Sequence, residues 1–186
     1  MSRLSYRILP NPDDKTHEVR LIVDGADWIG EDRLGLDPPD LIFELQRTAR
    51  DSIIVGRCTC GVIGCDDLVV KVARTAETVE WSRPDGPAVA FDADQFDDVV
   101  GTLARDRSWE PLGRTVEREL GAMFSGKVTD DGYAFDWSST RFRPGVVVMS
   151  VTKDGQQKLL EFSWDDATLD SALKRGRQFL RDRFED

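Results

Sequence analysis

The three cysteines of this 186-residue chain all lie within a window of eight residues. The window reads Cys58-Thr59-Cys60-Gly61-Val62-Ile63-Gly64-Cys65. Thiolates bind metal ions and act as redox nucleophiles, and the two glycines allow the backbone to turn tightly between them. The β-rich segments 52–57 and 68–74 flank the window, so we expect the cysteines at the tip of a strand-turn-strand unit.

Three interpretations of this window remain open. In the first, Cys58, Cys60 and Cys65 bind a metal ion, with zinc as the candidate. Structural zinc usually takes four ligands, and two to four residues usually separate paired cysteines, whereas one residue separates Cys58 from Cys60. The fourth ligand would be His17, Asp66, Asp67 or a water molecule. In the second interpretation the cysteines are reduced and pack in a partly buried environment, and in the third they form a disulfide or redox pair.

Other motifs for catalysis are absent from the sequence. It contains no Gly-x-Ser-x-Gly elbow, no His-Glu-x-x-His and no glycine-rich phosphate-binding loop. His17 is the only histidine, so few side chains are available as a base near neutral pH. These absences favour a protein that is not an enzyme.

The charge of the chain is strongly acidic, with a formal net charge of −10 and a pI near 4.7. Such a surface repels nucleic acid and favours a basic protein partner. One stretch combines a single base, Arg33, with seven acids: Asp24, Asp27, Glu31, Asp32, Asp37, Asp40 and Glu44. Five bases gather near the C-terminus, where a helix dipole would accommodate them: Lys174, Arg175, Arg177, Arg181 and Arg183.

Composition predicts a soluble cytoplasmic protein. Hydrophobic residues make up 40% of the chain, and no run is long enough to span a membrane. The opening residues Met1 to Tyr6 lack the apolar stretch of a secretory signal. An odd number of cysteines without a disulfide-rich pattern favours a reducing compartment.

Hydrophobic periodicity predicts an α+β fold with antiparallel sheet segments covered by about three amphipathic helices. Alternating residues indicate strands at 4–8, 19–23 and 133–137. Segments rich in β-forming residues indicate further strands at 52–57, 68–74, 78–81, 145–151 and 158–164. Apolar stripes at helical spacing indicate helices at 96–104, 112–124 and 169–184, and Asp37 before two prolines indicates a brief helix. Tyr133, Phe135 and Trp137 alternate, so we expect their rings on one face of a sheet, more as core than as a ligand platform.

We expect residues 1–186 to form a single domain, with a possible internal repeat. An aromatic residue and a capping aspartate precede a helix at Phe91-Asp92 and again at Trp164-Asp165. This match predicts two similar strand-strand-helix halves that meet near residues 108–126.

Several blocks within roughly residues 20–110 resemble a group of uncharacterised bacterial proteins. The most specific block is the Cys-x-Cys-Gly-x-x-Gly-Cys hairpin at Cys58 to Cys65. The others, in the same order along the chain, are Val23 to Trp28, Val79 to Trp81, Phe91 to Phe96 and Asp106 to Glu110. The resemblance implies a bacterial source and no known activity, metal or catalytic residue.

Two functions of different classes follow from these observations. The first is a non-enzymatic, acidic interaction protein of the inhibitor or immunity type that docks a basic partner. The second is a small metal-clipped or thiol-redox protein that uses Cys58, Cys60 and Cys65.

Overall fold

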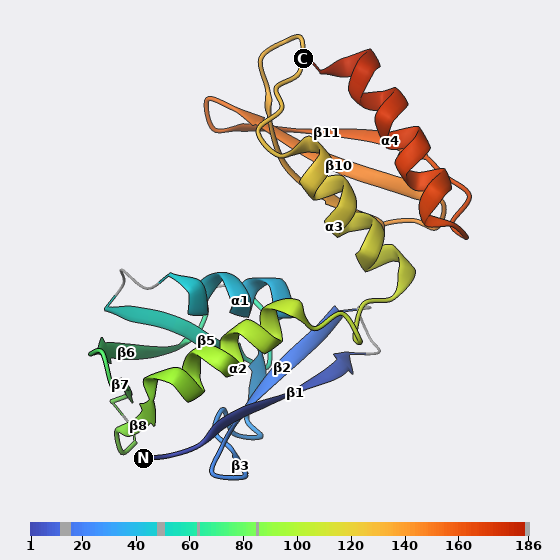
Figure 1. The fold of residues 1–186 in the computed structure, drawn as a ribbon. Helices are drawn as coiled ribbons and strands as arrows, with labels where there is room; N and C mark the ends of the chain where they lie inside the picture. The colour runs from blue at the N-terminus through green and yellow to red at the C-terminus, as the bar shows by residue number, and fades with distance from the viewer. Residues whose placement is uncertain (12–15, 48–50, 63, 85, 185–186) are drawn as a thin grey trace. The chain divides into compact units, whose positions relative to one another are not determined.

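A computed structural model of the chain describes residues 1–11, 16–47, 51–62, 64–84 and 86–184 (Figure 1). The chain divides into two compact units, unit 1 (Met1–Trp109) and unit 2 (Glu110–Asp186). Their junction falls within residues 108–126, where the sequence predicts that two halves meet. The single domain over residues 1–186 stays a prediction.

The described part of unit 1 contains eight strands and two helices. In chain order they are β1 (Leu4–Asn11), β2 (Thr16–Val23), β3 (Ala26–Asp27), β4 (Arg33–Gly35), α1 (Pro38–Gln46), β5 (Ser52–Cys58), β6 (Leu68–Arg74), β7 (Thr78–Ser82), β8 (Val89–Asp92) and α2 (Ala93–Arg105). Strands β1 to β3 form one antiparallel sheet, and β4 to β8 form a second one in sequential order. The turn between β1 and β2 involves residues 12–15, which lie outside the described residues.

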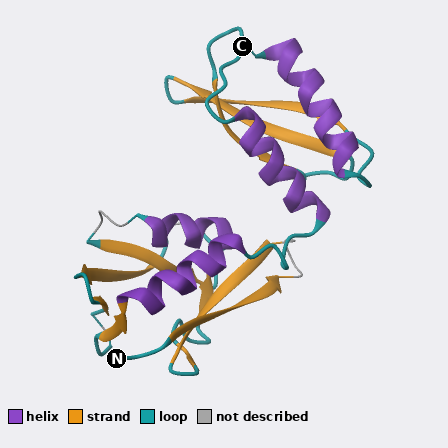
Figure 2. Ribbon diagram, viewed as in Figure 1, coloured by secondary structure: helices purple, strands orange, loops and turns teal. Residues whose placement is uncertain are grey.

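A single hydrophobic core joins the two sheets and the two helices of unit 1. Helix α1 packs on β2 and β5, and α2 packs on β1, β7 and β8 (Figures 1 and 2). Trp81 lies at the centre, fully buried, with its ring edge-on to Phe91 and Phe96 at centroid distances of 5.2 and 5.6 Å. Burying such a side chain contributes about 1.5 to 3 kcal/mol. Isolated bridges from Ser2 to Phe91 and from Val19 to Leu36 connect the two sheets.

The described part of unit 2 contains a three-stranded antiparallel sheet and two helices. Its elements are α3 (Leu112–Phe124), β9 (Ala134–Ser139), β10 (Val146–Lys153), β11 (Gln156–Ser163) and α4 (Leu169–Arg183). The sheet order is β11-β10-β9, with α3 packed against β9 and α4 packed against β11 and α3 (Figure 1). Alternate β10 residues Val147, Met149 and Val151 are buried in a core that includes Leu120 and Phe124 of α3. Both hairpin residues Asp154 and Gly155 have positive φ, as the predicted tight turn requires.

The α+β prediction is confirmed: the described residues contain four helices and eleven antiparallel strands. Each predicted strand corresponds to an observed one. The sequence did not indicate β3, β4 and β8, which are two, three and four residues long. Such short segments carry too few residues to show a period of two.

The helix caps match the sequence at some positions and differ at others. Asp92 caps α2 as predicted, because its carboxylate accepts a hydrogen bond from the Gln95 amide. The prediction that Asp165 caps the last helix is wrong, since Thr168 caps α4 and Asp165 accepts bonds from the amides of Ala167 and Thr168. Three antiparallel strands followed by a helix occur in both units, whereas a true duplication stays a prediction.

Within the described ranges, none of the helices has the length and apolar character to cross a bilayer.

Candidate metal centre

The structure brings the three cysteines together. The sulfur atoms of Cys58, Cys60 and Cys65 all lie within 4.8 Å of one another. Cys58 is the last residue of β5 and is half-buried, whereas Cys60 and Cys65 lie exposed in the loop that leads to β6. The expected position at a strand-turn-strand tip is therefore confirmed. Packing does not explain the cluster, because two of its three thiols face solvent and none belongs to a core.

Two consecutive turns fold the loop so that the thiols converge. The Gly61 amide donates to the Cys58 carbonyl at 3.1 Å, and the Cys65 amide donates to the Val62 carbonyl at 3.3 Å. Gly61 and Gly64 have φ values of 72° and 79°, which side chains with a Cβ rarely adopt. The glycines of the motif therefore permit the fold that gathers the sulfurs.

Strand β4 holds the loop between β5 and β6 through the side chain of Arg33. Arg33 lies opposite Cys58 in the β4–β5 ladder. Its guanidinium donates to the Asp66 backbone carbonyl at 3.0 Å and pairs with the Asp66 carboxylate at 3.0 Å. The buried Arg20 holds this segment in turn, because it donates at 2.6 Å to both the Gly30 and the Arg33 carbonyls. The return path of the loop is thus fixed by a residue 33 positions away from Asp66 in the sequence.

Hydrogen bonds among the thiols separate their acidities. A hydrogen bond from Cys58 is the main cause that lowers the pKa of Cys60 below its usual value. Hydrogen bonds to Cys60 and then to Cys58 raise the pKa of Cys65 to about 11. The neighbouring groups therefore stabilise the thiolate form of Cys60.

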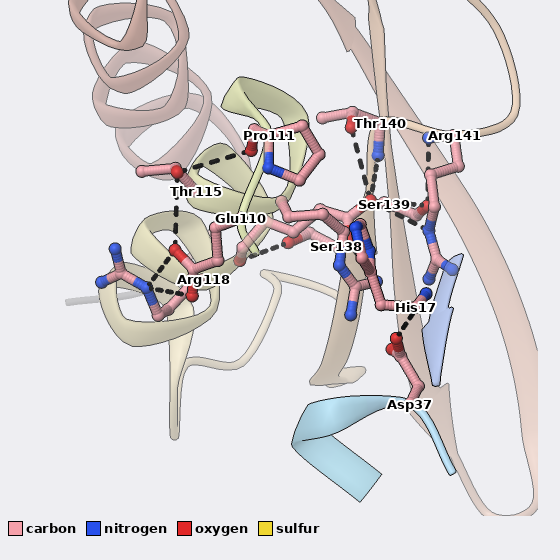
Figure 3. A network of polar contacts seen from close by, with 12 residues as sticks. His17, Asp37, Glu110, Pro111, Thr115, Arg118, Ser138, Ser139, Thr140 and Arg141 are labelled. Atoms are coloured by element: carbon pink, nitrogen blue, oxygen red, sulfur yellow. Dashed lines mark hydrogen bonds and ion pairs between the residues drawn. The ribbon is translucent and has the colours of Figure 1, made fainter. Parts of the chain in front are cut away.

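The proposed fourth ligands do not join the cluster. Among the described histidine, cysteine, aspartate and glutamate residues, only the three cysteines form a group with metal-ligand spacing. Asp66 pairs with Arg33, and Asp67 accepts a hydrogen bond from the Gly64 amide at 3.1 Å. His17 lies in β2, its ring edge-on to Trp109 and its amide bonded to Asp37 (Figure 3). Among the described residues, the ligand atoms that converge are therefore the three cysteine sulfurs.

This arrangement suits a thiophilic metal ion. A tetrahedral ion with Zn–S bonds of about 2.3 Å holds its sulfurs roughly 3.8 Å apart. Because the sulfurs already lie within 4.8 Å, they need to move together by at most about 1 Å. A disulfide needs a larger approach, to about 2.05 Å, and all three cysteines are free in this structure.

The predicted aromatic stripe is divided by a β-bulge. The pairing of β9 with β10 shifts register between Ser150 and Val151. Tyr133 and Phe135 pack on the core of unit 2, as expected. Trp137 instead stacks on the exposed Phe142, with ring centroids 6.1 Å apart and planes 11° apart. The expectation of three rings on one core face is wrong for Trp137, because the extra residue in β9 changes the alternation.

A second polar cluster in unit 2 was not indicated by the sequence. Glu117, with 9% side-chain exposure, pairs with Arg114 through one oxygen and accepts hydrogen bonds through the other from Ser139, Thr140 and Arg141. The nearby Glu110 receives the Arg118 Nε at 3.1 Å on each oxygen (Figure 3). These groups satisfy buried carboxylates between α3 and the end of β9, which is a structural role. Only the spacing of Arg114 and Glu117 on one helix face could have suggested it.

The acidic stretch 24–44 serves mainly internal contacts. Five of its seven acids accept hydrogen bonds or form ion pairs within unit 1: Asp24 with Arg3, Asp27 with Arg20, Asp37 with His17, Asp40 with Arg57 and Glu44 with Ile54. The C-terminal bases follow the predicted pattern for a helix dipole, with Asp170 in the first turn of α4 and Arg181 and Arg183 in the last.

Comparisons with known proteins add no relative. The resemblance to uncharacterised bacterial proteins stays a prediction. The chain matches no protein-family model, no curated protein and no solved structure.

Proposed function

We propose that this protein binds one thiophilic metal ion, with zinc as the first candidate, through Cys58, Cys60 and Cys65. The observation that carries the proposal is the mutual approach of all three sulfur atoms to within 4.8 Å at the end of β5. Packing does not account for this approach, because Cys60 and Cys65 are exposed and none of the three thiols belongs to a hydrophobic core. The lowered pKa of Cys60 supports the proposal further, because the thiolate is the form that binds metal.

Metal analysis of the protein, purified under reducing conditions without a histidine tag, tests this proposal. We expect native mass spectrometry to show one zinc ion per chain after zinc addition. A variant with Cys58, Cys60 and Cys65 all replaced by serine should lose it. Val62→Ser is the matched control, because it places a hydroxyl on the same exposed loop and keeps all three thiols. If the unaltered protein retains no zinc ion, the proposal is refuted.

A second candidate function is docking of a basic protein partner, with no enzymatic activity. Its support is the uneven charge: unit 1 has 21 acids and 13 bases and unit 2 has 14 acids and 12 bases, so the net charges are −8 and −2. The internal contacts of the stretch 24–44 weaken this candidate, because they occupy most of the acids that suggested it. Retention of a basic partner from lysate at low salt and its release at high salt would support it. A protein that retains none at low salt would not be such a module.

We also propose that this protein belongs to the cytoplasm of a bacterial cell, because a reducing compartment keeps free thiols such as these three reduced. The acidic net charge further argues against a nucleic-acid partner. Fractionation of cells that carry the tagged gene tests the compartment.

A further inference from the structure

The number of ligands at the cysteine cluster sets what the bound ion can do. Structural zinc sites usually close their coordination with four protein ligands, whereas sites that act on other molecules keep one position for an external ligand. Among the described residues only three ligand groups converge here. Resting on the proposed function, we infer that the ion held by Cys58, Cys60 and Cys65 keeps an open fourth position that binds an external donor.

The surroundings of the cluster favour this open position. Cys60 and Cys65 are exposed, so solvent and small molecules reach the side of the ion that faces away from β5. The two nearest acids in the sequence are held elsewhere: Asp66 by Arg33, and Asp67 by the Gly64 amide. One Asp67 oxygen is buried without a hydrogen-bond partner, so this carboxylate is the group that could close the site by a movement of the loop. Its substitution therefore belongs in the test.

Charge selects the class of external donor. A divalent ion bound to three thiolates carries a net charge of −1, and Asp66 and Asp67 add further negative charge close by. Arg33 offsets part of it through its pair with Asp66. An anionic donor approaches this site against repulsion, whereas a neutral nitrogen donor does not. The open position therefore prefers a neutral nitrogen ligand, such as an imidazole, to a small anion.

Cobalt substitution tests the inference directly, because the visible bands of Co(II) report the number and type of its ligands. The protein is loaded with Co(II) and titrated with imidazole and, separately, with azide. We expect imidazole to shift the visible spectrum, with a half-saturating concentration lower than that of azide by about fivefold or more. Asp67→Asn keeps an acceptor for the Gly64 amide and removes the charged oxygen. It should leave the imidazole shift in place.

The outcomes separate this inference from the proposed function. If the cluster binds neither Co(II) nor zinc, metal binding itself is refuted. If Co(II) binds but neither imidazole nor azide changes its visible spectrum, the protein still binds metal and the inference of an open fourth position is wrong. If Asp67→Asn made an unresponsive site responsive, Asp67 would be the fourth ligand and the inference would be wrong. An azide response at the same or lower concentration than imidazole would overturn the preference for a neutral donor.

Discussion

The three thiols at the end of β5 differ in their surroundings: Cys58 is half-buried, whereas Cys60 and Cys65 are exposed. Their acidities differ as well, since the pKa of Cys60 is lowered and that of Cys65 is raised. The sequence placed Cys58, Cys60 and Cys65 on one short loop, and the structure confirms that their sulfurs converge. Their exposure and their different acidities could not be predicted, because both depend on which thiol bonds to which neighbour. The partners of Asp66 and Asp67 were equally hidden, since one is a distant strand residue and the other a loop amide.

Metal affinity should rise with pH between pH 6 and 8. The pKa of Cys65 is raised to about 11, so this thiol is protonated in the metal-free protein and must release its proton when it binds. Each released proton increases the apparent affinity by about tenfold per pH unit. Competition with a chromophoric chelator at several pH values measures the slope. A flat profile would show that Cys65 does not bind as a thiolate.

At the scale of elements, the sequence predicted long strands and striped helices and missed the strand that positions the site. Strand β4 has only three residues, Arg33 to Gly35, and its partner β5 lies more than 15 residues further along the chain. Neither its length nor its local pattern distinguishes it from a loop. Its role depends on ladder register, which places Arg33 opposite Cys58, and register is a property of the folded sheet.

Loss of the Arg33 contacts should weaken metal binding without unfolding the protein. Arg33→Met removes both bonds to Asp66 and keeps much of the side-chain volume, so the loop that returns Cys65 to the cluster is less restrained. We expect zinc affinity to fall by about tenfold, in the range typical of groups that orient metal ligands. Arg74→Met is the matched control, because it removes an arginine–aspartate pair with Asp97 in the same unit. Equal affinities for both variants would argue against a positioning role for Arg33.

The close approach of β4 to β2 should make Gly35 intolerant of a side chain. A Cβ at Gly35 would run into the backbone carbonyl of Val19, and backbone atoms in a paired strand cannot move aside cheaply. We expect Gly35→Ala to lower the free energy of unfolding by about 1 to 3 kcal/mol, measured by urea denaturation. Gly121→Ala provides the comparison, because its Cβ meets nothing within 4 Å and alanine favours a helix by about 1 kcal/mol. A stable Gly35→Ala protein would contradict the packing described here.

At the scale of the whole molecule, the described residues form two hydrophobic cores, one in each unit. The match between Phe91-Asp92 and Trp164-Asp165 predicted halves that meet near residues 108–126, and the boundary between the two units lies in that range. Hydrophobic periodicity could not assign each helical stripe to a core, since that depends on contacts between residues far apart in the sequence. The difference in net charge between the units can be counted from the sequence once the boundary is known.

Damage to the core of unit 2 should leave metal binding in unit 1 unchanged. Gly176 of α4 is buried against α3, and a Cβ there would lie 2.5 Å from the fully buried Leu120 Cδ2. Overpacking costs about 1 to 3 kcal/mol, which offsets or exceeds the gain in helix propensity of about 1 kcal/mol. We expect Gly176→Ala to lower the thermal stability while zinc stoichiometry at 25 °C remains one per chain. Loss of zinc from this variant under folding conditions would show that the site depends on unit 2.

The compactness of the cysteine window in sequence affects how metal binding is linked to folding. All three ligands lie within eight residues, so an unfolded chain still presents them close together. A ligand that binds both the native and the unfolded state stabilises the native state only by the difference between its two affinities. That difference comes from contacts that only the folded chain makes, chiefly the hydrogen bond and the ion pair between Arg33 and Asp66. The metal will therefore raise the melting temperature by less than its affinity for the folded protein implies. The contacts of Arg33 determine the size of this shortfall, because they determine how much more tightly the folded chain binds the metal than the unfolded chain does.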